Sequence, residues 1–237
     1  MLTIYRLTLR QLSGRWRLGI MTVLAAMPVI ITMLMLWNNE DMSVAEFEEF
    51  VVSVMLSGSI APLVVLAIAA AAFGNEVEDR TLANLTITPI PRWKIALPKL
   101  LATITIAGPF IVLSALVIAH VAFLGEWSAT IATAVAALVG VAMYASLFVW
   151  LGLVSTQAIG LGLLYIVVWE GFFSGFVSGV RLLSIRHYAI ALMNGIDDRR
   201  FADFDHASLG VAIVMSVLVI GGFLLLSIRR LRRMDVP

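Results

Sequence analysis

Six long apolar runs, separated by short polar segments, dominate the pattern of residues along this chain. Each run has about the 20 residues that an α-helix needs to cross the hydrocarbon core of a bilayer. The runs are rich in Leu, Ile, Val and Ala and lack the short alternating segments of a transmembrane β-barrel. We therefore predict an all-α membrane protein with six spans, at residues 18–37, 51–73, 100–124, 129–154, 158–180 and 207–228.

The composition agrees with this class. Hydrophobic residues make up 61% of the 237 positions and charged residues 13%, and the mean hydropathy is +1.02. Such a chain has too little polar surface to coat a water-soluble globule. It contains no cysteine and 11 methionines. Met33 and Met35 point apart on one helix without a neighbouring His or Cys, so we predict no metal site and expect the methionines to fill gaps between helices.

Basic residues cluster in alternate polar segments. Twelve of the 16 lie before the first run, between the second and third runs, or after the sixth, whereas the segment after the first run carries only acids. Because cytoplasmic segments carry the excess of Lys and Arg, we predict a multi-pass protein of the plasma membrane with both termini in the cytoplasm. Anionic lipid headgroups account for these clusters, so we expect no nucleic-acid partner. The twelve residues are Arg6, Arg10, Arg15, Arg17, Arg80, Arg92, Lys94, Lys99, Arg229, Arg230, Arg232 and Arg233.

The first residues of the chain have the pattern of an amphipathic helix. Apolar residues recur at spacings of 3 and 4 positions, at Leu2, Tyr5, Leu9, Leu12 and Trp16. Basic residues have similar spacings and lie one position after members of this set. We predict that residues 1–17 form a helix that lies in the cytoplasmic interface of the membrane. The alternative is an ordinary basic extension of the first span.

A charged segment between the second and third runs is the most informative part of the sequence. Residues 74–99 contain three acids and four bases, and Glu76 and Arg80 have the four-residue spacing that pairs side chains on a helix. A half-apolar pattern continues to Pro89 and Pro91, which would end such a helix. We predict a short cytoplasmic helix in a loop at residues 75–94. The residue pattern alone leaves open whether this helix transmits force from a partner or is a solvated turn.

Residues 76–99, EVEDRTLANLTITPIPRWKIALPK, resemble the signature of the ABC-2 type ABC transporter permeases. The resemblance covers nearly the whole chain and implies one permease domain over residues 1–237, with short re-entrant outer helices within residues 171–206. It also implies that the charged segment is a coupling helix that docks on an ATP-binding subunit. The implied contact residues are Glu76, Glu78, Asp79, Arg80 and Thr81; the family commonly has Gly-Thr where this chain has Arg80-Thr81.

The same resemblance requires a separate ATPase. The sequence contains no G-x-x-x-x-G-K-[ST] phosphate loop, and no glycine is followed by lysine. We therefore expect no enzymatic activity and no cofactor in this chain, with ATP and Mg bound by the partner subunit. Six helices enclose little room for a large solute, so a second copy or a related permease would complete the pathway. Nothing suggests docking of an external binding protein, which favours export of an amphipathic or hydrophobic compound.

Glu170 is the only acid within a predicted span. A carboxylate in an apolar run is costly unless something compensates its charge, and Arg181, Arg186 or a group of a second subunit could do so. Glu170 is then either a gate on the substrate path or a structural carboxylate. The other polar residues that could line a path are His120, Tyr144 and Gln157.

Two other classes of protein compete with a permease subunit. A stand-alone secondary carrier or channel would need no ATPase, but carriers usually show internal repeats and several ionisable residues at the midplane, and this sequence shows no convincing repeat. An intramembrane protease is disfavoured because neither G-x-S-x-G nor H-E-x-x-H occurs.

Overall fold

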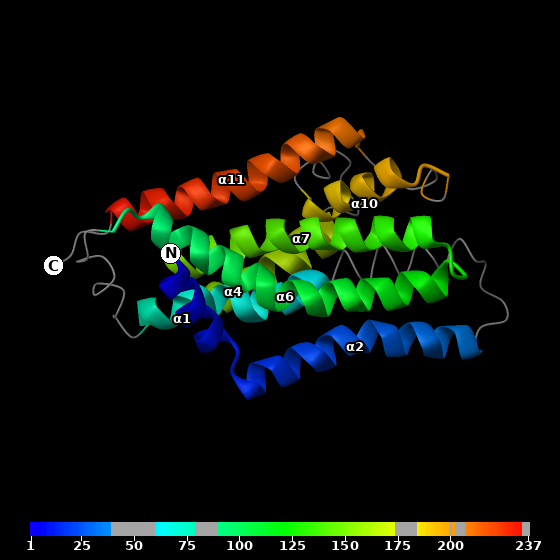
Figure 1. The fold of residues 1–237 in the computed structure, drawn as a ribbon, viewed down its shortest axis with the longest axis horizontal. Helices are drawn as coiled ribbons and strands as arrows, with labels where there is room; N and C mark the ends of the chain where they lie inside the picture. Colours follow the sequence, from blue (N-terminus) through cyan, green and yellow to red (C-terminus); the bar gives the residue numbers. More distant parts are fainter. Residues whose placement is uncertain (39–59, 79–89, 174–183, 200, 202–206, 234–237) are drawn as a thin grey trace.

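The computed structural model is helical, with no strand in the residues that it describes, which are 1–38, 60–78, 90–173, 184–199, 201 and 207–233 (Figure 1). The predicted all-α class is therefore confirmed over these ranges. The elements are α1 (Leu2–Leu12), α2 (Arg15–Asn38), α4 (Ala61–Glu78), α6 (Trp93–Ala122), α7 (Trp127–Val154), α8 (Ala158–Leu164), the π-helix η2 (Tyr165–Phe173), α10 (Ile185–Ile196) and α11 (Leu209–Arg233). Five of them, α2, α4, α6, α7 and α11, are long and apolar enough to cross a membrane.

The predicted spans agree best with α2 and α7, whose bounds differ from the prediction by at most three residues. The predicted span at 129–154 ends where α7 ends, at Val154. By contrast, α4 continues to Glu78 and α6 already begins at Trp93, so both ends of the loop expected at residues 75–94 are helical. The start of the second predicted span, residues 51–59, lies outside the described residues.

The fifth predicted span differs most from the structure. Instead of one α-helix over 158–180, the chain forms the short helix α8 and then the π-helix η2; residues 174–180 lie outside the described part. A π-helix interrupts the regular hydrogen bonding of an α-helix and is found frequently at functional sites. The six-span topology stays a prediction.

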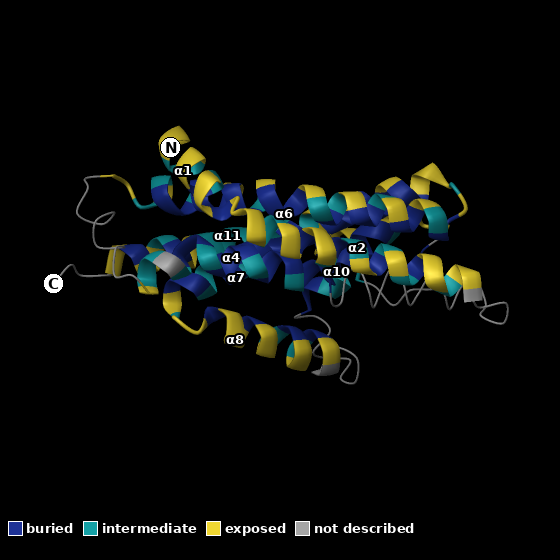
Figure 2. Cartoon of the chain, turned by 90° about the horizontal axis from the view of Figure 1, so that it is seen from below, coloured by how far each residue is buried: buried dark blue, intermediate teal, exposed yellow. Residues whose placement is uncertain are grey.

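Helix α7 lies at the centre of the bundle. It packs against α4, α6, α8, α10 and α11, while α2 packs on α6 and α4 at the edge. Colouring by burial shows the same order, with dark blue residues inside and yellow residues on the outer helices and on α8 (Figure 2). Only 22% of the most apolar stretch of α2 and 17% of that of α11 are buried. Their exposed apolar faces suit contact with lipid or with another subunit.

Small residues allow α4 and α7 to approach each other closely. A Cβ atom added to Gly152 would lie 2.5 Å from the carbonyl oxygen of Ala70, too close for any side chain without movement of the backbone. Because lipid tails are as apolar as the side chains, helices in a membrane associate through such close packing more than through the hydrophobic effect. Gly152 therefore sets the distance between the two helices.

The N-terminal segment forms a separate helix that is shorter than predicted. Helix α1 ends at Leu12, where the hydroxyl of Ser13 donates a hydrogen bond back to the carbonyl of Leu9, and α2 begins at Arg15. A serine that bonds its own backbone in this way, followed by glycine, favours a break in the helix. The prediction of one helix over residues 1–17 was wrong in this respect.

The predicted apolar stripe, which runs from Leu2 to Trp16, faces the protein at the end of α1 and not at the two ends of the stripe. Leu12 is fully buried, and the hydroxyls of Tyr5 and Thr105 on α6 form a 2.9 Å hydrogen bond. Leu2 and Trp16, which the pattern assigned to the same stripe, are 61% and 82% exposed. Helix α1 therefore packs on α6, and its predicted position in the membrane interface stays a prediction.

The two ends of the bundle differ in what they carry. Helix α1 and the C-terminal end of α11, with its basic residues Arg229 to Arg233, lie at one end, together with the end of α4 and the start of α6 (Figure 1). Helix α10 and the turn between α6 and α7 lie at the opposite end. This arrangement agrees with the sequence-based expectation that both termini share one side.

Candidate functional site

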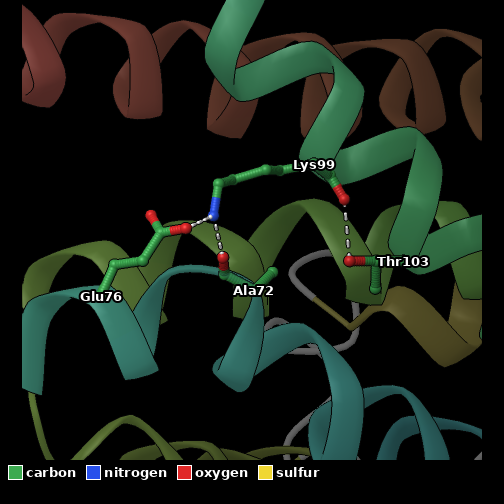
Figure 3. A network of polar contacts seen from close by, with 4 residues as sticks. All are labelled: Ala72, Glu76, Lys99 and Thr103. Carbon is green, nitrogen blue, oxygen red and sulfur yellow. Dashed lines mark hydrogen bonds and ion pairs between the residues drawn. The ribbon is translucent and has the colours of Figure 1, made fainter. Parts of the chain in front are cut away.

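An ion pair joins α4 to α6 at the end of the bundle that carries α1. The ammonium group of Lys99 on α6 lies 2.5 Å from a carboxylate oxygen of Glu76 on α4 (Figure 3). The same ammonium donates a hydrogen bond to the carbonyl of Ala72, one helical turn before Glu76. Lys99 is only 1% exposed and Glu76 is 17% exposed. The pair is therefore largely shielded from water.

The local sequence explains how a lysine can be buried at this position. Ala72, Phe73 and Glu76 lie on one face of the last turns of α4, since residues three and four apart are neighbours on a helix. The ammonium of Lys99 lies 4.5 Å from the centre of the Phe73 ring, a favourable distance for a cation–π contact. The long hydrocarbon arm of lysine can be buried in apolar surroundings while its charge reaches the carboxylate.

This geometry corrects the sequence-based placement of Lys99. We expected Lys99 in a cytoplasmic loop among exposed bases, whereas it is a buried residue of α6. The hydropathy pattern assigned it to the loop because a lysine interrupts an apolar run. A single base at the edge of such a run, with an acid at the end of the preceding helix, was the signal that could have revealed the pair.

The five predicted contact residues of the charged segment fall into three groups. Glu76 faces Lys99, and Glu78 is exposed at the end of α4. The other three lie outside the described residues, so the predicted Glu76–Arg80 pair stays a prediction. These three are Asp79, Arg80 and Thr81.

Glu170 lies in η2 and is fully buried. Its carboxylate accepts hydrogen bonds from the hydroxyl of Tyr165 at 3.0 Å, from the hydroxyl of Ser184 at 2.5 Å and from the backbone N–H of Ile185 at 2.9 Å. Hydrogen bonds to a charged group are shorter and stronger than neutral ones. These donors thus compensate the carboxylate, for which the sequence had suggested Arg181, Arg186 or a group of a second subunit.

Two of these donors belong to the start of α10. Ser184 caps this helix, since its hydroxyl accepts a hydrogen bond from the backbone N–H of His187 at 3.4 Å. The positive end of the helix dipole also favours a carboxylate at this position. Glu170 therefore holds α10 against η2, which favours the structural role over the gate. Of the two predicted basic partners of Glu170, Arg181 lies outside the described residues. Arg186 lies in the first turn of α10, and its pairing with Glu170 stays a prediction.

The three remaining polar candidates lie in different parts of the bundle. Tyr144 of α7 is fully buried and interacts with Glu170, with Arg186 near enough to act on it electrostatically. His120 is exposed and its ring packs on Trp127, 5.0 Å between centroids. Gln157 is exposed before α8. The structure thus brings Tyr144 to Glu170 and leaves the other two apart.

A cavity opens at the end of the bundle that carries α10. It has a volume of about 590 Å³ and lies between the start of α7 and the end of α10. Acidic and aromatic side chains contribute to its wall. The lining residues are Glu126, Trp127, Ser128, Ile196, Asp197, Asp198 and Arg199.

The apolar helices and the buried polar contacts between them define a multi-pass membrane protein. Comparison with protein families then gives its relationship: a family described as ABC-2 family transporter protein matches residues 9–185, well over half of the chain. The chain belongs to this family, and it is accordingly a membrane permease of the ABC transporter type. A search of curated proteins finds no match to the chain.

Proposed function

We propose that this chain is the membrane subunit of an ATP-driven exporter and that separate ATP-binding subunits drive it. The observation that carries this proposal is the family match, which includes the whole charged segment between α4 and α6. Members of such a family need a surface on which an ATPase can act. The charged segment supplies one, because Glu78 at the end of α4 is exposed.

The contact with the ATP-binding subunit involves Glu78 together with Asp79, Arg80 and Thr81. Charged residues suit this role because electrostatic complementarity selects the partner and fixes its orientation. Closure of the ATPase on ATP and Mg then moves the segment, and the helix bundle responds as a rigid body, the kind of transition that packed interfaces support. Both termini and this segment lie in the cytoplasm, and the protein spans the plasma membrane.

The pathway forms between two permease subunits, either two copies of this chain or one copy and a related chain. The exposed apolar faces of α2 and α11 offer surface for such a contact and for lipid. The cavity between α7 and α10 then lies on the outer side, where an exported compound would leave. Glu170, held by its three donors, supports the wall of this outer region as a structural carboxylate.

Co-purification tests the proposal. The tagged chain is isolated from its native host in mild detergent, and the bound proteins are identified by mass spectrometry. We expect a P-loop ATPase in about equal amount. Reversal of the acids at Glu78 and Asp79 to lysine should reduce its recovery, whereas the control variant Glu126→Lys, at the opposite end of the bundle, should not. Recovery of the folded chain without an ATPase would instead favour a stand-alone carrier.

A further inference from the structure

We propose that the Lys99–Glu76 ion pair is a clamp that makes the end of α4 and the start of α6 move as one body. This inference rests on the proposed function, in which an ATP-binding subunit acts on the charged segment between these helices. Glu76 is then a positioning residue inside the permease and does not contact the ATPase.

The position of the pair in the chain is the first argument. Glu76 lies in the last turn of α4 and Lys99 in the second turn of α6, and the segment that would meet the ATPase connects these two turns. The ion pair therefore joins the two helices close to where this segment leaves α4 and enters α6. A displacement of the segment is therefore transmitted to α4 and to α6 at the position of the ion pair.

The contacts of the lysine are the second argument. Its ammonium bonds the Glu76 carboxylate and the Ala72 carbonyl and lies over the Phe73 ring, so all three contacts are with one face of α4. A residue of α6 is thus held by more than one turn of α4. A bond between the hydroxyl of Thr103 and the carbonyl of Lys99, 3.0 Å long, adds to the order of α6 at this point.

Burial is the third argument. An exposed ion pair contributes little because water and salt screen it. Removal of one partner from a buried pair is strongly destabilising, because it leaves an uncompensated charge away from water. Since Lys99 is 1% exposed, separation of α4 from α6 at this level would strand the ammonium. Movement of the two helices together therefore costs less free energy than their separation.

The orientation of Glu76 separates it from its neighbour Glu78. One oxygen of Glu76 bonds Lys99, and the other is buried without a hydrogen-bond partner in the described part of the chain. Glu78, two residues later, is exposed. Neutralising Glu76 should therefore loosen the two helices, whereas neutralising Glu78 should leave their spacing unchanged.

Spin labels can measure this spacing without knowledge of the substrate. The chain has no native cysteine, so labels can be placed with Gly74→Cys on α4 and Trp93→Cys on α6; a Cβ at Gly74 meets nothing within 4 Å, and Trp93 is 42% exposed. Electron paramagnetic resonance then gives the distance distribution between the labels. In the complex with its ATPase, we expect one narrow distribution that is the same with ADP and with ATP and Mg.

The substitutions Glu76→Gln and Lys99→Met should each broaden this distribution and make it shift between the two nucleotides. The control Glu78→Gln should leave it narrow and unshifted. If the single variants fail to fold, the double variant Glu76→Gln with Lys99→Met, which leaves no unpaired buried charge, should fold and should still show the broad distribution that shifts between the two nucleotides. A distribution that stays narrow in Glu76→Gln or Lys99→Met would overturn the clamp.

The two levels of the proposal fail separately. If no ATPase co-purifies, the proposed function fails. The distribution of label distances, measured in the chain without an ATPase, still tests the clamp. If the ATPase binds normally but neutral variants keep the wild-type distribution, the clamp fails and the proposed function stands.

Discussion

The hydroxyl of Ser184 at the start of α10 donates a 2.5 Å hydrogen bond to the carboxylate of Glu170 in the π-helix η2. Both residues are buried. The bond therefore joins two elements of the bundle through an acid that the sequence places in an apolar run. The hydroxyl of Tyr165 and the backbone N–H of Ile185 also donate hydrogen bonds to this carboxylate.

The first prediction concerns this carboxylate. Glu170→Gln replaces an acceptor of three hydrogen bonds by an amide that accepts through one oxygen only, and hydrogen bonds to charged groups contribute about 1.5–3 kcal/mol each. We expect a free energy of unfolding lower by about 2 kcal/mol, read as a lower thermal midpoint in detergent. The exposed control Glu78→Gln should leave the midpoint unchanged. An unchanged midpoint in Glu170→Gln would mean that these bonds do not hold α10.

The second prediction concerns the contact between α4 and α7. Gly152→Val places a side chain against the Ala70 carbonyl, where even a Cβ would be 2.5 Å away. Overpacking of this kind costs about 1–3 kcal/mol or more, so we expect a lower yield of folded protein and a lower thermal midpoint. Gly160→Val on α8 is the matched control, because a Cβ there meets nothing within 4 Å. Equal effects at both glycines would argue against the close approach.

The third prediction separates packing from membrane anchoring in the N-terminal segment, residues 1–17. Leu12 is fully buried and Trp16 is 82% exposed. Leu12→Ala should lower stability in detergent by about 2 kcal/mol, since it leaves a cavity against the bundle. Trp16→Ala, in the first turn of α2, should leave stability in detergent unchanged and weaken only the association of this end of α2 with lipid. The reverse order of the two effects on stability would contradict the packing of α1 on α6.

The fourth prediction concerns orientation in the membrane. The absence of native cysteine allows single cysteines to report which side they face. Trp127→Cys, at the end with α10, should react with a membrane-impermeant maleimide in intact cells, and Arg230→Cys should react only after the membrane is opened. The physical reason is the excess of bases at the end with α1 and the C-terminal part of α11. Labelling in the opposite order would invert the proposed topology.

The sequence predicted the all-α membrane class because this class depends on long apolar runs. The end of α7 at Val154 was predicted to the residue, since a polar segment follows an uninterrupted apolar run there. The match to the ABC-2 family confirmed the resemblance that residues 76–99 suggested. Composition and residue pattern predict the class of protein because the bilayer requires every helical span to be long and apolar.

The contacts between helices could not be predicted in the same way. The structure joins Glu76 to Lys99, 23 residues along the chain, a contact between two helices that the spacing of residues within one helix does not predict. The donors of Glu170 likewise include Ser184, at the start of another helix. The change to a π-helix at Tyr165 does not alter the apolar character of the run, so the hydropathy pattern does not reveal it. Such pairings depend on how helices pack, and helix periodicity does not encode that packing.

The central claim, that the segment after α4 meets an ATP-binding subunit, is tested most directly by site-specific cross-linking. Single cysteines at Asp79 and Thr81 carry a photoactivated cross-linker in native membranes, with Trp127→Cys at the opposite end as the control. We expect a P-loop ATPase attached at both positions and absent from the control. Cross-links to lipid or to the permease alone at Asp79 and Thr81, in membranes that contain the ATPases of the host, would contradict the account.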